Sequence, residues 1–192
     1  MYSIMADENM GRRVRGRLKK CGRGVQIYPL AKIANPHVVE IGDYSRIDDF
    51  TFMNGGQGVK IGRYVHISCF ASIIGGGELI VDDYAVIGYG ARIITGTDTY
   101  QSGKRMSTPL PEEQRCVVRG KVVVGKDAFI GANVVVHPDV RIGEGAVIGS
   151  NSLVCKDIDP WSVNVGSPCK KIAERPRVTL QDTETERDNA SE

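Results

Sequence analysis

Residues 124–154 read VGKDAFIGANVVVHPDVRIGEGAVIGSNSLV, and a six-residue period runs through the whole stretch. Each repeat begins with a β-branched aliphatic residue, at Val124, Ile130, Val136, Ile142, Ile148 and Val154. Four positions later comes a second residue that is mostly small: Ala128, Val134, Val140, Ala146, Ser152 and Ile158. The pattern predicts that each unit is a short strand plus a tight corner, with both of these side chains pointing inward.

The period also selects an architecture for the rest of the chain. Three units close a triangular coil, and successive coils stack as parallel strands about 4.8 Å apart. β-branched side chains then form ladders along the axis. The same register recurs upstream at Ile41, Ile61 and Val81, with small breaks near Gly55 and at 75–77. We therefore expect an all-β parallel β-helix of roughly six coils, about 30 Å long, interrupted by an inserted loop at about residues 95–120.

Composition excludes several classes of protein. The 192 residues carry a formal net charge of +2, too balanced for a dedicated nucleic-acid binder. The chain contains no apolar run of the roughly 18 residues that a membrane span needs. Its N-terminal basic run is not followed by the apolar stretch of a secretory signal, so we expect a cytoplasmic protein. The five cysteines contain no C-x-x-C pair, which argues against a zinc ribbon or a thioredoxin-type motif.

The two ends differ in composition from the repeats. We expect residues 1–24 to form a basic cap segment, with a short helix at 6–20 and Asp7 as its N-cap. The β-helix domain is predicted at 25–175, with Trp161 packing on its last coil. Residues 176–192 form a polar tail that we predict to be disordered.

Three further stretches carry a resemblance to a known family. They are YVHIS at 64–68, TGTDTYQSG at 95–103 and PWSVNVGSPCKKI at 160–172. With the hexapeptide register, they resemble the hexapeptide-repeat acyltransferases, in particular the maltose, galactoside and polysaccharide O-acetyltransferase branch. The resemblance implies a left-handed β-helix and a homotrimer with its active sites in clefts between subunits. It also implies that acetyl-CoA lies along each cleft and that the inserted loop covers the acceptor.

Acyl transfer to a hydroxyl needs a base for the hydroxyl proton. The branch commonly carries a histidine at the start of the insertion, whereas this chain has Asp98 there. A carboxylate with a pKa near 4 is a weak base, although burial can raise that value. His66 ends its repeat just before inward-pointing Ile67, so we expect it to face outward near a cleft. Asp98 and His66 are therefore the candidate catalytic residues, while His37 and His137 are interpreted as structural.

The resemblance also implies sites for both substrates. The pantetheine channel would be lined by small residues of the late coils, Gly131, Ala132, Gly149, Ser150 and Asn151. Lys170 and Lys171 match the basic end of the family's closing motif, where a cation meets a phosphate of CoA. Within the insertion, Tyr100, Glu112 and Glu113 are the candidate contacts to the acceptor.

The expected function is transfer of acetyl from acetyl-CoA to a hydroxyl of a sugar or polysaccharide precursor. N-acetylation of a nucleotide-linked amino sugar is an alternative, because a neutral amine attacks a thioester without a strong base. A non-catalytic trimeric scaffold is another. A zinc enzyme of the carbonic-anhydrase type shares the predicted prism, but His37, His66 and His137 lack the close spacing that such a metal site requires.

Overall fold

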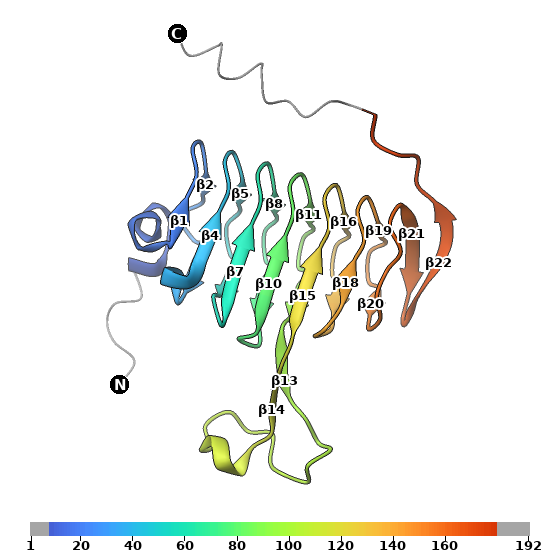
Figure 1. Cartoon of the computed structure of the whole chain (residues 1–192). Helices are drawn as coiled ribbons and strands as arrows, with labels where there is room; N and C mark the ends of the chain where they lie inside the picture. Colours follow the sequence, from blue (N-terminus) through green and yellow to red (C-terminus); the bar gives the residue numbers. More distant parts are fainter. Residues whose placement is uncertain (1–7, 180–192) are drawn as a thin grey trace.

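The computed structural model describes residues 8–179, whose strands wind into a prism of stacked coils (Figure 1). Each coil contributes one strand to each of three sheets. The first sheet consists of six parallel strands, β1 (Lys20–Cys21), β4 (Val39–Ile41), β7 (Gly58–Ile61), β10 (Glu78–Val81), β15 (Lys121–Val124) and β18 (Arg141–Ile142). The third sheet also has six, β3 (Lys32–Ala34), β6 (Phe52–Asn54), β9 (Ser72–Ile74), β12 (Arg92–Ile94), β17 (Val135–Val136) and β20 (Leu153–Val154).

The second sheet extends further along the prism than the other two. Its parallel strands are β2 (Gln26–Ile27), β5 (Arg46–Ile47), β8 (His66–Ile67), β11 (Val86–Ile87), β16 (Phe129–Ile130), β19 (Val147–Ile148) and β21 (Ser162–Gly166). The antiparallel strand β22 (Cys169–Glu174) then closes the end of this sheet. The fold is a left-handed parallel β-helix, as expected, and β21 adds a seventh level to the six predicted coils.

The interior follows the six-residue pattern. The six aliphatic residues from Val124 to Val154 have no exposed surface, and the residues four positions later are buried as well. Ladders form as predicted: Ile61 lies beside Ile41 on one side and Val81 on the other, in register. Fully burying one such side chain contributes roughly 2 kcal/mol. The stack of coils therefore supplies a continuous aliphatic core without large aromatic rings.

The breaks in the period lie at the corner between the third and first sheets. The extra residues near Gly55 form the turn between β6 and β7, and those at 75–77 form the turn between β9 and β10. The 3-10 helix η3 (Pro36–Val38) occupies the equivalent corner one coil earlier. The long insertion leaves the prism at this same corner, so all of the irregular segments lie along one edge.

The N-terminal end is capped by the 3-10 helix η2 (Gly11–Arg17), which replaces the longer helix predicted at 6–20. The backbone N–H of Gly11 donates a hydrogen bond to the Ala31 carbonyl at 3.0 Å, and the Val14 side chain is completely buried in the core. Asp7, the predicted N-cap, lies outside the described residues. The first coil begins with β1 at Lys20, earlier than the boundary predicted at Val25, because β1 pairs with β4.

At the other end, Trp161 packs as predicted: it is 9% exposed, with the guanidinium groups of Arg175 and Arg177 within 6 Å of its ring centroid. The part of the predicted tail beyond residue 179 lies outside the described residues. Across residues 8–179, helices are too short and too polar to cross a membrane.

Candidate active site

His66 lies on the outer face of the second sheet, where the imidazole meets a carboxylate from the neighbouring coil. Its Nε2 is 2.8 Å from Oδ2 of Asp48, which follows β5. The His66 side chain is 33% exposed, whereas that of Asp48 is 3% exposed. An ionised carboxylate only accepts hydrogen bonds, so Nε2 donates, and in the neutral imidazole Nδ1 keeps a lone pair. The pair therefore presents one ring nitrogen that can accept a proton.

Arg46 holds Asp48 from the other side. Its Nε donates to Oδ1 of Asp48, and its guanidinium carbon lies 4.9 Å from the ring centroid of Tyr28. Burial by itself raises the pKa of Asp48, but the hydrogen bonds from Arg46 and His66 outweigh it and leave that pKa below its ordinary value of 3.8. Asp48 consequently stays ionised near neutral pH and orients the His66 ring.

The insertion forms an arm that projects from the prism (Figure 1). Its stem is an antiparallel pair, β13 (Gly96–Asp98) and β14 (Val117–Arg119), in which Asp98 lies opposite Val117. Beyond the stem lies the short 3-10 helix η4 (Glu112–Gln114). The described chain thus carries its predicted acceptor-binding segment away from its own second sheet.

The stem of the arm is attached to the prism at the glycine-rich corner formed by residues 75–77. The Thr95 hydroxyl accepts a hydrogen bond from Gly77 N–H at 3.0 Å and donates one to the Ile74 carbonyl at 2.9 Å. A Cβ atom on Gly75 would lie 2.2 Å from the backbone nitrogen of Gly96. Only glycine permits so close an approach of the two backbones, which seats the stem directly on the preceding coil.

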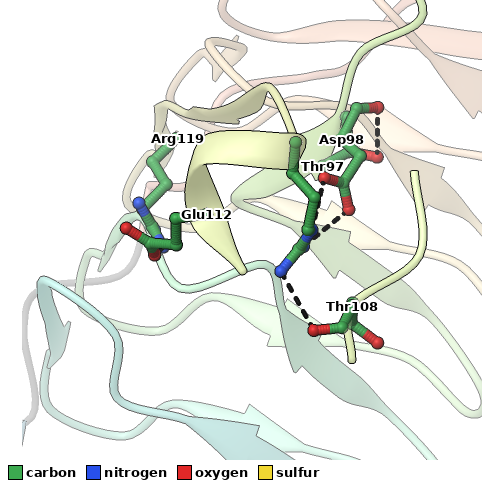
Figure 2. A network of polar contacts seen from close by, with 6 residues as sticks. Thr97, Asp98, Thr108, Glu112 and Arg119 are labelled. Atoms are coloured by element: carbon green, nitrogen blue, oxygen red, sulfur yellow. Dashed lines mark hydrogen bonds and ion pairs between the residues drawn. The ribbon is translucent and has the colours of Figure 1, made fainter. Parts of the chain in front are cut away.

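Asp98, the candidate base on the arm, is engaged in an ion pair. Its two carboxylate oxygens accept hydrogen bonds from Nε and Nη2 of Arg115 at 2.9 and 2.7 Å. Arg115 also donates to the Thr108 carbonyl at 3.2 Å, so the pair ties the stem to the tip, as the dashed lines around Asp98 and Thr108 show in Figure 2. The hydrogen bond from Arg115 holds the pKa of Asp98 below its ordinary value of 3.8. A carboxylate in this state is a weaker base than an ordinary one.

The three predicted acceptor contacts all lie on the arm and are exposed. Tyr100 exposes 77% of its surface. Glu112 forms an ion pair with Arg119 at 3.3 Å, at the left of Figure 2, and Glu113 neighbours it on η4. These side chains face solvent in the isolated chain, which makes them available to a bound ligand or a second subunit.

The predicted donor-binding residues gather at the C-terminal end of the second sheet. Gly131 and Ala132 follow β16, while Gly149, Ser150 and Asn151 follow β19 one coil later. The two corners are in direct contact, because Asn151 N–H donates to the Ala132 carbonyl at 2.8 Å.

The two predicted lysines complete this group. Strand β22 brings Lys170 opposite Val165 of β21, and a Cβ atom on Gly149 would lie 2.7 Å from Val165. Lys171 is paired with Glu174 at 2.5 Å. The small residues of the late coils and the basic closure therefore share one end of the prism, and their role in CoA binding stays a prediction.

The two candidate catalytic residues lie on different parts of the described structure. In the described structure His66 lies on the second sheet and Asp98 on the arm, so a single chain does not combine them. His37 and His137 are exposed residues of the corner region between the third and first sheets. Residues 8–179 contain no cluster of three histidine, cysteine or acidic side chains that could hold a metal ion.

Sequence reasoning missed Asp48, Arg46 and Arg115. A signal for Asp48 was present, because Ile47 and Ile67 belong to one ladder and place residue 46 beside residue 66. The side chain two positions after Arg46 then lies within reach of the imidazole. Nothing in the hexapeptide period identifies Arg115, since it belongs to the arm.

Comparison with known proteins agrees with this architecture. The family model "Bacterial transferase hexapeptide (six repeats)" matches residues 115–156. A dTDP-4-amino-4,6-dideoxy-D-glucose acyltransferase from Escherichia coli is 39% identical over 165 residues, which cover 85% of each chain. The chain therefore belongs to the hexapeptide-repeat acyltransferases, and it is an enzyme that transfers acyl groups.

Two solved structures are similar over most of the chain. AntD, an N-acyltransferase from Bacillus cereus in complex with dTDP and 3-hydroxybutyryl-CoA, is 34% identical with a TM-score of 0.79, covering 84% of this chain and 85% of AntD. A hexapeptide-repeat-containing acetyltransferase from Vibrio cholerae in complex with acetyl-CoA has a TM-score of 0.61 at 19% identity, covering 86% and 75%. The second likeness bears on the fold alone.

Proposed function

We propose that this protein transfers an acyl group from an acyl-CoA to the amino group of a nucleotide-linked amino sugar. The observation that carries the proposal is the ion pair between Asp98 and Arg115. Asp98 is at the position where the family branch usually has its catalytic base, and the hydrogen bond from Arg115 lowers the pKa of Asp98. An amine acceptor tolerates this arrangement, because its lone pair attacks without prior removal of a proton. The similarity to two acyltransferases named for dTDP-amino-sugar or N-acyl chemistry supports the same acceptor.

In this reaction the neutral amine attacks the thioester carbonyl, so a C–N bond forms and the C–S bond breaks. The nitrogen loses one proton, and the CoA thiolate gains one to leave as the free thiol. His66 is the side chain best prepared to carry that proton, because Asp48 fixes its Nε2 and leaves Nδ1 to accept. In this proposal Asp98 acts by holding the arm over the acceptor, in place of the predicted role as base.

O-acylation of a sugar hydroxyl is the second candidate. It is favoured by the His66–Asp48 pair, which resembles the oriented imidazole that activation of a hydroxyl needs. The two acceptors differ in their need for this base, so removal of His66 should abolish transfer to a hydroxyl and should only slow transfer to an amine.

The active assembly in this proposal is a homotrimer. The corner between the second and third sheets exposes Phe50, Phe70 and Tyr89 at 53%, 63% and 60%, and the first two rings stack at 4.9 Å. Such an apolar ridge is typical of a surface covered by another subunit. In the proposed trimer, the arm of a neighbouring copy covers His66, which the chain's own arm leaves uncovered.

The test is a thiol-release assay with acetyl-CoA and 3-hydroxybutyryl-CoA against dTDP-linked amino sugars and their hydroxyl analogues. The proposal expects release only with the amino compounds, and mass spectrometry should find an amide. Release with the hydroxyl analogues alone would replace it with O-acylation. Calorimetric CoA binding without turnover on any acceptor would contradict both.

A further inference from the structure

The N-terminal end of the prism carries a positive charge that the rest of the chain does not share. Residues 1–24 hold seven basic and two acidic side chains, for a net charge of +5. The chain as a whole carries +2, so residues 25–192 carry −3. The reaction proposed above uses none of these seven basic side chains.

The basic side chains are distributed around this end of the prism, opposite β22 (Figure 1). The 3-10 helix η2 is fixed there by the buried side chain of Val14. The exposed cations come from η2, from the edge strand β1 and from the segments that flank β1, and they are Arg12, Arg13, Arg17, Lys19, Lys20 and Arg23. They therefore face whatever meets the prism end-on.

Acidic neighbours balance this charge only in part. Three of the cations form surface ion pairs, Arg17 with Glu8 at 3.2 Å, Lys19 with Glu40 at 2.9 Å and Arg23 with Asp43 at 3.8 Å. Exposed ion pairs of this kind contribute little free energy and are screened by salt. A second anion can therefore share these cations, and the end keeps its positive charge.

A cavity of about 1000 Å³ at the same end has one cationic wall and one apolar wall. Its cationic wall is η2, with Arg12, Arg13 and Arg15, and its apolar wall is the corner after β2, with Tyr28 and Leu30. None of the described residues that line the cavity is acidic. Cationic and apolar surfaces side by side suit an amphiphilic anion, such as a lipid with a phosphate headgroup.

We propose that this basic end docks on the surface of a membrane that contains anionic lipids. A group of four to eight Lys and Arg side chains is sufficient for such binding, since each contributes to attraction by the negative lipid surface. The net negative charge of residues 25–192 is repelled by the same surface, so the contact is made by the end of the prism. In a three-fold trimer all three caps have the same direction along the symmetry axis, so their charges would meet one surface together.

A nucleic acid is the competing anionic partner. Binding along a nucleic acid backbone uses a stripe or groove of cations on one face. Here the cations surround an end and border an apolar wall, which fits a plane of lipid headgroups better.

Co-sedimentation of the full chain with vesicles tests the proposal. The two kinds of vesicle are phosphatidylcholine alone and phosphatidylcholine mixed with phosphatidylglycerol. Binding is expected only to the mixed vesicles and should weaken as salt is added. The measurement needs no acyl transfer, so its result is independent of the proposed reaction.

A double substitution locates the contact. Arg12→Glu with Lys20→Glu should weaken binding to the mixed vesicles about a hundredfold, because each reversal changes two charges near the lipid surface. Arg141→Glu with Lys156→Glu is the matched control, since both residues are exposed, lie on later coils and change the net charge equally. This control should keep most of the binding, and circular dichroism checks the fold of both variants.

Four results would overturn the inference. The first is a lack of binding to the mixed vesicles at low salt, and the second is equal binding to phosphatidylcholine alone. The third is an equal loss in the control variant, which would make the effect one of net charge. The fourth is tighter binding to a short DNA duplex, weakened by the same double substitution, which would assign the surface to a nucleic acid.

Discussion

Asp98, the last residue of β13, accepts two parallel hydrogen bonds of 2.9 and 2.7 Å from Arg115, which lies two residues before β14. Both side chains are largely shielded from solvent, at 9% and 12% exposure. The guanidinium geometry matches the carboxylate, which restricts the relative orientation of the two segments. A carboxylate with both oxygens hydrogen-bonded to Arg115 is suited to a structural role in the arm more than to the role of a base.

Asp98→Asn should therefore lower turnover by loosening the arm, with CoA affinity nearly unchanged. Arg115→Ala should cause a similar loss, since it removes the same contact. Steady-state kinetics and CoA calorimetry measure the two effects, with Arg119→Ala, at the exposed pair with Glu112, as the control. If Arg115→Ala keeps its turnover and shifts only the pH optimum, Asp98 is the base. Unchanged turnover in Asp98→Asn would remove Asp98 from the mechanism.

A second prediction concerns His66 and the carboxylate behind it. Asp48→Asn keeps the shape but removes the negative charge that orients the ring, so turnover should fall about tenfold to a hundredfold. The pH profile should change as well, and the double variant with His66→Ala should lose no more than His66→Ala alone. If His66→Ala leaves turnover and affinity intact, the pair belongs to the scaffold of the second sheet.

The lowered pKa values of Asp48 and Asp98 predict the direction of acid sensitivity. Both groups have folded-state pKa values below 3.8, so the stability that they contribute is present above that pH. It is lost as pH falls below 3.8 and the carboxylates become protonated. Thermal unfolding between pH 7 and pH 3 should show this decline, and Asp48→Asn should weaken it. A decline already complete at pH 5 would contradict these assignments.

Lys170 and Lys171 should contribute unequally to donor binding. Lys171 is held by Glu174, whose hydrogen bond raises the pKa of the lysine. We expect Lys170→Ala to weaken CoA binding about threefold to tenfold at low salt, and Lys171→Ala to have a smaller effect. Calorimetry with CoA and dephospho-CoA would show whether a phosphate is the contact. Equal binding by both variants and the unaltered protein would exclude the basic closure from the site.

The apolar ridge predicts a trimer that can be dissociated by one charge. Phe70→Glu should yield a folded monomer with little activity, because the charge would be buried against a neighbouring copy. Light scattering measures the mass, and circular dichroism checks the fold. Ile172→Glu is the control for the mass alone, because Ile172 is 64% exposed on β22, away from the ridge, but directly follows Lys171. A monomeric mass for the unaltered protein would refute the proposed inter-subunit site.

The prism was predictable from the sequence because its period is enforced by contacts between equivalent positions. Val124 and Ile142 are neighbours in one ladder, so each constrains the other's size and shape. The arm follows no such rule. Asp98 meets Arg115 only through a hairpin whose turn is irregular, and the sequence offers no period from which to infer the pairing.

The N-terminal cap and the His66–Asp48 pair show two further reasons why the sequence alone did not predict the structure. A basic segment at 6–20 fits many short helical forms, so packing of Val14 into the open coil decides the outcome. His66 was correctly expected to face outward, but its partner lies one coil away, and only the register of β5 with β8 reveals it.

The way in which the arm is attached to the prism affects how an enzyme of this kind can evolve. Gly75 and Gly77 touch the backbone of the stem, and Thr95 fixes it through hydrogen bonds to the preceding coil. None of these contacts involves the tip. Segments of different length and chemistry could therefore be exchanged beyond the stem without disturbing the aliphatic ladders. If the arm covers the acceptor, as proposed, then acceptor preference can diverge by replacement of a single surface hairpin, without any change to the coils.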